Sequence, residues 1–241
     1  MSGIISSNIV TDGLVFYVDA ANPNSYISGN TTTNDLILDN NGTLTNGVGF
    51  STENNGAWDF DGTNDYVGCN TLVDTVKDDN IGTISIWVKP NDILNNRVFI
   101  SFTASNQTRQ YLTMALSGTY NFYVAMRSDS NPSSGFFVYS DTNPFVPGQW
   151  INLNVTQDGV SPQLYVNGVS VSQTFFVDDN DQKWINDMSS FNLVNISRLV
   201  TSNLNQNYFD GQIANVNVYN KDLSSDEVLQ NYNALKGRFG L

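Results

Sequence analysis

The sequence contains no histidine, which removes the side chain that most often acts as a general base near neutral pH. The absence also excludes histidine-based triads and histidine metal sites. A single cysteine, Cys69, can form neither an internal disulfide nor a cysteine-rich zinc site. Glutamate occurs only at Glu53 and Glu227, so few residues are available for acid–base chemistry. We therefore predict that the protein is not an enzyme.

Basic residues are also scarce. Ten Lys and Arg stand against 23 Asp and Glu, which gives a net charge of -13. Because phosphate contacts need clustered cations, nucleic acid is not an expected partner. No apolar run approaches the roughly 20 residues of a spanning helix, so membrane insertion is not expected either. Residues 1–10 lack the pattern of a signal peptide, which predicts synthesis in a host cytoplasm.

Alternation of apolar and polar residues fills most of the chain and predicts antiparallel strands with one buried face. In Thr83–Lys89 and Ile151–Thr156 every second residue is apolar. Near the end, Ala214, Val216 and Val218 alternate with asparagines, which we expect on the polar face. Further strands are expected at 14–18, 98–103, 110–116, 121–127, 136–139, 164–166, 171–176 and 191–196.

Turn and capping residues complete this prediction. Asn167-Gly168 is typical of a type I′ hairpin turn, whose two central residues need positive φ. One helix is expected at about 224–236, with Ser224 and Glu227 as a capping box. We expect this helix to pack across one end of the sandwich. The chain is predicted to form a single domain over 1–241, with a short N-terminal arm at 1–12; its oligomeric state is not predicted.

Several segments together resemble the laminin-G-like, concanavalin A-like superfamily. They are Trp58–Val67 (WDFDGTNDYV), Thr83–Pro90, Gly148–Trp150, Leu164–Gly168, Tyr208–Ile213 and Tyr219–Leu223. One departure is Ser197, which stands where the family usually has glycine before an arginine, here Arg198. The resemblance spans residues 14–236 and implies an all-β, antiparallel jelly-roll β-sandwich with one short C-terminal α-helix.

Two further segments resemble jelly-roll proteins from tailed-phage structural gene clusters, especially marine and cyanobacterial phages. These segments are Asp12–Tyr26 and Tyr232–Gly240. The resemblance implies a non-enzymatic virion protein exposed on the particle, as capsid decoration, head fibre or tail component, with other virion proteins as partners. The alternative function is a glycan-binding adhesin module for host surface polysaccharide, with or without calcium.

The same superfamily includes glucanases, whose signature is a pair of catalytic glutamates on one strand. Glycoside hydrolysis requires two carboxylates about 5–9.5 Å apart. Glu53 is expected in a turn and Glu227 at a helix start, so they do not form such a pair. Glycosidase activity is therefore the least favoured of the three functions.

Two sets of residues are candidates for binding. Asp59, Asp61, Asn64 and Asp65 are oxygen donors within seven residues, a composition that calcium favours. The alternative is that these carboxylates satisfy backbone N–H groups of a tight turn, and no cofactor is required. Candidate glycan-stacking residues are Phe136, Phe137, Tyr139 and Trp184. For Trp58, Trp87 and Trp150 we favour burial over sugar stacking.

Overall fold

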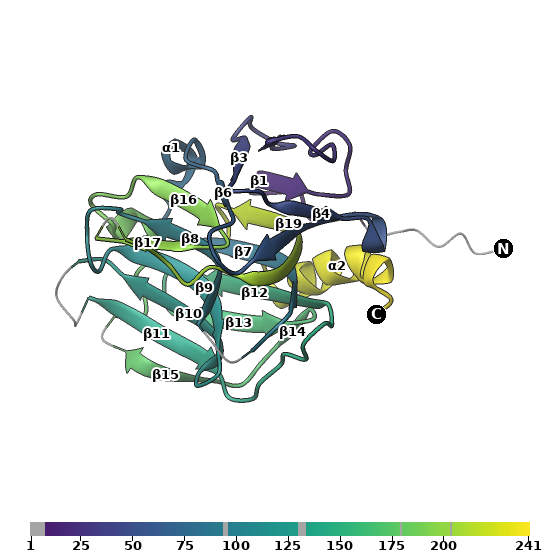
Figure 1. Ribbon diagram of the computed structural model, residues 1–241. Helices are drawn as coiled ribbons and strands as arrows, with labels where there is room; N and C mark the ends of the chain where they lie inside the picture. Colours follow the sequence, from purple (N-terminus) through teal and green to yellow (C-terminus); the bar gives the residue numbers. More distant parts are fainter. Residues whose placement is uncertain (1–7, 94–95, 130–133, 179, 203) are drawn as a thin grey trace.

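Two antiparallel β-sheets lie face to face in the computed structural model (Figure 1). The structure describes residues 8–93, 96–129, 134–178, 180–202 and 204–241. The predicted all-β sandwich with one short C-terminal helix is confirmed, and its arrangement is that of a concanavalin A-like jelly roll.

One sheet has eight strands, seven of them in one continuous order, with β1 pairing β19 beside that path. The order is β14 (Val169–Ser170), β13 (Pro162–Val166), β12 (Ile151–Gln157), β7 (Gly82–Pro90), β19 (Asp210–Tyr219), β5 (Ala57–Asp61) and β4 (Gly49–Ser51), and β1 is Leu14–Asp19.

The second sheet has nine strands. Their order is β15 (Gln173–Asp178), β11 (Gly135–Ser140), β10 (Asn121–Arg127), β9 (Tyr111–Ser117), β8 (Arg97–Thr103), β16 (Leu193–Ile196), β6 (Tyr66–Gly68), β3 (Gly42–Thr45) and β2 (Thr32–Thr33). A hairpin of β17 (Leu199–Thr201) and β18 (Leu204–Gln206) contacts β8. We call the face of this sheet that points away from the eight-stranded sheet its outer face.

The main core lies between the sheets and follows the predicted alternation on β7 and β12. Their apolar residues Ile84, Ile86, Val88, Ile151, Leu153 and Val155 are all buried. The prediction for Ala214 is wrong. A register shift between Ile213 and Asn215 places Ile213 in the main core, while Ala214 packs with Trp87 on the opposite face of the sheet.

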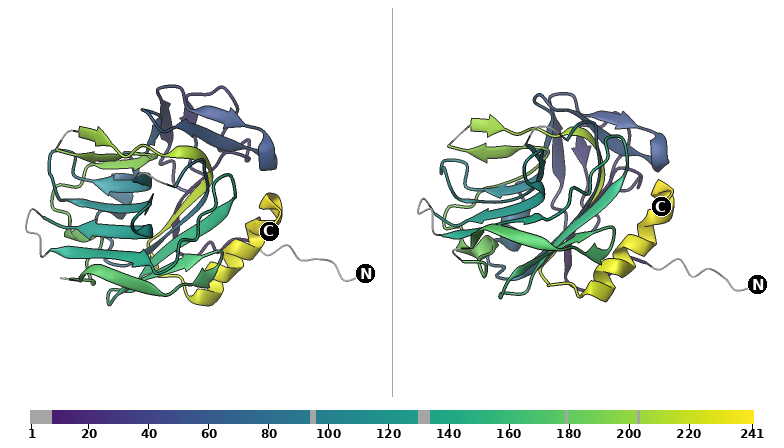
Figure 2. Two further views of the ribbon diagram at one scale, coloured as in Figure 1. Left: turned by 60° about the horizontal axis from the view of Figure 1, so that its bottom comes forward. Right: turned by 90° about the horizontal axis from the view of Figure 1, so that it is seen from below.

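The helix α2 (Ser225–Leu235) and the turn η3 (Lys236–Phe239) lie against the eight-stranded sheet, on the side away from the other sheet (Figure 2). Ser224 and Glu227 form the expected capping box. The prediction that α2 packs across one end of the sandwich is wrong, since Tyr232 and Phe239 stack on Trp87 in the middle of the sheet. A second short helix, α1 (Leu72–Val76), was not expected.

This cover buries the polar face of β12 and β19. Asn152, Asn154, Asn215 and Asn217, which the alternation placed on an exposed face, are at most 3% exposed. Asn154 Nδ2 donates to Asn152 Oδ1 at 2.8 Å, so these two amides bond to each other. The expectation of solvent-exposed asparagines is therefore wrong, because alternation identifies the two faces of a strand but not what covers each face.

Other expectations hold. Trp58, Trp87 and Trp150 are all buried. Asn167 and Gly168 have φ of 50° and 80° and join β13 to β14, as the hairpin signal predicted. Within the described part of the chain, no helix is long and apolar enough to cross a membrane.

Candidate functional site

Aromatic side chains gather on the outer face of the nine-stranded sheet. On β10, Phe122 and Val124 enter the core, so Tyr123 between them points outward. The same alternation on β11 sends Phe136 inward and Phe137 outward. We call the outward cluster the aromatic row, which comprises Tyr120, Tyr123, Phe137, Tyr139 and Phe176.

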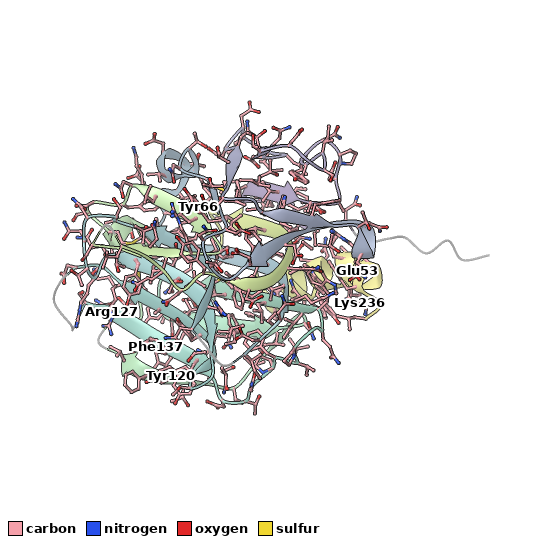
Figure 3. The ribbon with its side chains drawn as sticks, in the orientation of Figure 1. Glu53, Tyr66, Tyr120, Arg127, Phe137 and Lys236 are labelled. Atoms are coloured by element: carbon pink, nitrogen blue, oxygen red, sulfur yellow. The ribbon has the colours of Figure 1, made fainter. Side chains whose placement is uncertain are left out.

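The rings of the aromatic row contact one another. The rings of Tyr123 and Phe137 stack with centroids 4.9 Å apart and an angle of 14° between their planes. Tyr120 meets the edge of Phe137 at 4.9 Å, and both labelled side chains lie together in Figure 3. Phe176 on the edge strand β15 is 63% exposed and 5.4 Å from Tyr120. Apolar rings in this setting form a platform on which a flat, weakly polar ligand can stack.

A hollow of about 360 Å³ lies beside this row and is bordered on its other side by the β17–β18 hairpin. We call it the aromatic hollow. Aromatic side chains on its sheet side are Tyr111, Tyr123 and Phe137, and residues on its hairpin side are Leu199, Thr201 and Gln206. Its size is within the range of small-ligand sites and fits one or two sugar rings.

Polar groups surround the apolar floor of the aromatic hollow. Gln206 Nε2 donates to Thr201 Oγ1 at 2.7 Å, and this hydrogen bond orients the Gln206 amide. Asn96 and Asn207 also line the hollow. Burial, and then the neighbouring Tyr111, raise the pKa of the Tyr123 phenol. A tyrosine hydroxyl is protonated at neutral pH in any case, so this group can donate a hydrogen bond. An aromatic floor with amide and hydroxyl walls matches the chemistry of a sugar, which has C–H faces and hydroxyl edges.

The predicted glycan residues divide between surface and core. Phe137 and Tyr139 belong to the aromatic row. Phe136 and Trp184 are 0% and 1% exposed in the main core, so their assignment as stacking residues is wrong. Sequence reasoning missed Tyr123, although the alternation of β10 was a sufficient signal for it.

The proposed calcium ligands occupy one turn but serve its backbone. Asp61 Oδ1 accepts from the N–H groups of Thr63 at 2.8 Å and Asn64 at 3.2 Å. Burial raises the pKa of Asp61, but these hydrogen bonds outweigh it and lower the pKa below its ordinary value. Asp65 Oδ2 accepts from Asp61 N at 3.3 Å.

The other candidate ligands also have partners in the fold. Asp59 lies two residues before Asp61 on β5, opposite Gln212, and the backbone carbonyl of Asn64 accepts from Asn46 Nδ2 at 2.8 Å. In the described ranges, no group of three or more acidic or thiol side chains is placed to hold a metal ion. The geometry thus matches the alternative in which Asp61 and Asp65 accept hydrogen bonds from backbone N–H groups of a tight turn. Calcium binding stays a prediction.

A partly buried arginine fixes the same turn from the neighbouring sheet. Arg97 Nη1 donates to Gly62 O and Tyr208 O at 3.1 and 2.9 Å. Its Nη2 pairs with Asp92 at 2.7 Å and lies 3.7 Å from Asp210. The Asp61–Gly62 turn is therefore part of the framework of the fold.

The two glutamates form ion pairs with different lysines. Glu53 pairs with Lys89 at 2.9 Å, and Glu227 pairs with Lys221 at 2.8 Å while capping α2. Neither is placed as one member of a catalytic carboxylate pair.

The fold and the outer face define a lectin-like β-sandwich. The family model for the concanavalin A-like lectin/glucanases superfamily, Laminin_G_3, matches residues 61–229. The chain belongs to this family. A comparison with curated proteins finds no significant match.

Several solved structures of similar fold come from carbohydrate-active proteins. Domain 4 of AbnA, an extracellular arabinanase from Geobacillus stearothermophilus solved with arabinotriose, has a TM-score of 0.66 and 16% identity; the match covers 91% of this chain and 98% of that one. The CBM40 of the Ruminococcus gnavus IT-sialidase, bound to α2,3-sialyllactose, has a TM-score of 0.57 and 17% identity over 65% and 84% of the chains. The NanB sialidase of Streptococcus pneumoniae has a TM-score of 0.62 and 13% identity over 72% of this chain and 27% of its own.

Proposed function

We propose that the protein is a non-enzymatic glycan-binding module whose ligand lies in the aromatic hollow. The observation that carries the proposal is the stack of Tyr123 and Phe137 beside a hollow walled by amide and hydroxyl groups. A sugar can place its apolar C–H face on Tyr111 or on the exposed edge of this stack while its hydroxyls bond to Gln206 and its neighbours.

The similar structures support this function at the level of ligand class. The AbnA domain was solved with arabinotriose, and the sialidase CBM40 with sialyllactose. Both ligands are oligosaccharides, and both proteins share the fold of this chain. The adhesin interpretation of the sequence is thus better supported than the virion interpretation.

Binding to an array of neutral and acidic oligosaccharides tests the proposal. The wild-type protein should bind at least one class, and Phe137→Ala should weaken that binding about tenfold or more, because it removes half of the stack. Leu229→Ala, on the exposed side of α2, is the control and should bind as wild type. Failure of every glycan to bind, or equal binding by Phe137→Ala, would refute the proposal.

Location on a phage particle stays a prediction based on the resemblance of residues 12–26 and 232–240. It is compatible with glycan binding, since a surface protein of a virion can attach the particle to host polysaccharide. Antibody labelling of purified particles tests it: labelling on capsid or tail is expected, and its absence from particles would show that the prediction is wrong.

Calcium binding by the Asp61 turn is a separate proposal. A bound ion would stabilise the folded state and raise its Tm as the calcium concentration increases. Asp61→Asn should remove that increase. An unchanged Tm of the wild-type protein in calcium would refute calcium binding at this turn and leave glycan binding unaffected.

A further inference from the structure

A second hollow, of about 280 Å³, opens on the same outer face beyond the β17–β18 hairpin. Its floor includes Tyr66 on β6, which points outward because its neighbour Val67 enters the core. The side chain of Arg198, just before β17, forms one wall, and we call this site the Arg198 hollow. Its remaining polar residues are Asn41, Thr43, Thr45, Asn70 and Thr71.

The guanidinium of Arg198 is held in place by neutral groups. Its Cζ lies 3.3 Å from the centroid of the Tyr66 ring, a cation–π contact. Nε and Nη2 donate to Asn195 Oδ1 at 3.1 and 2.9 Å, and Nη1 donates to Asn205 Oδ1 at 3.2 Å. Asn195 is fully buried, so the acceptor that orients the guanidinium is itself fixed.

No carboxylate neutralises this cation in the part of the chain that the structure describes. By contrast, Arg97, Lys221 and Arg238 each form ion pairs with Asp or Glu. The contrast is informative in a protein with 23 acidic and ten basic residues. An arginine stacked on a ring and held by amides keeps its full charge for an external anion.

Hydrogen-bond counting leads to the same conclusion. A guanidinium has five N–H groups, and the contacts to Asn195 and Asn205 use three of them. One N–H remains on each terminal nitrogen, and Arg198 is only partly buried. Two such donors match the two oxygens of a carboxylate, the acceptor with which arginine forms its strongest hydrogen bonds.

Ser197 determines where Arg198 points. Its φ of 77° is in the left-handed region, which explains why glycine is usual at this position in the family. The Ser197 carbonyl accepts from Phe209 N at 2.9 Å, and its own N–H donates to Phe99 O at 2.9 Å. Serine therefore forms the same bulge here that glycine usually forms, and the bulge directs the Arg198 side chain toward Tyr66.

We infer that the Arg198 hollow binds the carboxylate of an acidic sugar, such as a uronic acid, within the glycan that the outer face recognises. This inference rests on the proposed function and names the class of its ligand. The threonine and asparagine side chains around Arg198 would bond to the hydroxyls of the same sugar. Because the net charge of -13 repels anions at long range, a local cation is needed to favour an acidic ligand.

The test compares each of a panel of carboxylated oligosaccharides with its own methyl ester, which keeps the sugar and removes the charge. The wild-type protein should bind at least one acid about tenfold more tightly than its ester. Arg198→Gln should abolish this difference while still binding the ester. The matched control is Arg109→Gln, which removes an exposed positive charge just before β9 of the nine-stranded sheet. This variant should still bind the acid more tightly than the ester.

The outcomes separate the two proposals. Equal binding of acid and ester by the wild-type protein, or an unchanged preference in folded Arg198→Gln, would overturn the role of Arg198 and leave glycan binding intact. If the protein binds no acid, no ester and no neutral glycan of the array, the proposed function itself is overturned. If Arg198→Gln does not fold, Arg198→Lys, which keeps the charge but loses the paired donors, should still show a reduced preference.

Discussion

Nη1 of Arg238 donates to Oδ1 of Asp19 at 2.8 Å, and the two side chains are each only 9% exposed. The pair joins the last turn of the chain to its first strand. Arg238 Nε also donates to Asn54 O at 2.7 Å, and Asn54 Oδ1 accepts from the Trp150 indole at 2.9 Å. The C-terminal segment is therefore a fixed part of the sandwich.

Removal of this arginine should destabilise the fold strongly. Arg238→Ala leaves Asp19 buried without its charge partner and removes the cation that lies 5.0 Å from the Phe239 ring, so we expect a loss of about 3–5 kcal/mol in the free energy of unfolding. Urea unfolding measures it, with Arg109→Ala as the exposed control. A loss below about 1 kcal/mol would contradict the role given to the pair.

A second prediction concerns Asp35, which sequence patterns did not single out. Its carboxylate accepts four backbone N–H groups at 2.9–3.1 Å, and it is 6% exposed. The donors are Tyr17, Ile37, Leu38 and Asn40.

Asp35→Ala should lower the free energy of unfolding by about 2–4 kcal/mol, because it leaves one buried and three partly buried backbone N–H groups without their acceptor. The exposed Asp78→Ala is the control and should change stability little. Chemical denaturation gives both values, and equal stability of the two variants would show that the Asp35 contacts contribute nothing.

The pH dependence of stability should include a contribution from Asp79. Burial, and then the charge of Asp78, raise the pKa of Asp79 to about 6. Since this pKa is higher in the folded than in the unfolded chain, the folded state binds the proton more tightly, and its stability increases as the pH falls through 6 towards 4. At neutral pH the charged form opposes folding.

Asp79→Asn should therefore raise the Tm at pH 7.5 by about 1–2 °C, a small effect because the group is partly exposed. At pH 4.5 the advantage should vanish. Thermal scans at the two pH values check the prediction, which fails if the difference between variant and wild type is the same at both.

Local patterns predicted the strands that carry the fold. In β7 and β12 the alternation is strict, and the apolar residues enter the core as expected, although the polar face of β12 is covered as well. The prediction failed at Ala214, where one extra residue reverses the alternation, and at Phe136 and Phe137, where two adjacent aromatics give no indication of which one enters the core. Two-residue strands such as β2 and β14 are too short to show a period.

The site depends on contacts between segments distant in the sequence, so it could be predicted only in part. Phe137 was identified, but its partner Tyr123 and the hairpin residue Gln206 come from other strands. Arg198 was noted for its bulge alone, because neither its stacking on Tyr66 nor its lack of a carboxylate partner among the described residues is visible in a linear pattern. Spacing along the chain carries no information on such long-range juxtapositions.

The most direct test of glycan binding at the outer face is an NMR titration of the isotope-labelled protein with the oligosaccharide that binds most tightly on the array. We predict that the shifted backbone amides cluster on β9, β10 and β11 and on the β17–β18 hairpin, around the stack of Tyr123 and Phe137. Shifts confined to β1, α2 or other elements on the far side of the molecule would contradict the central claim.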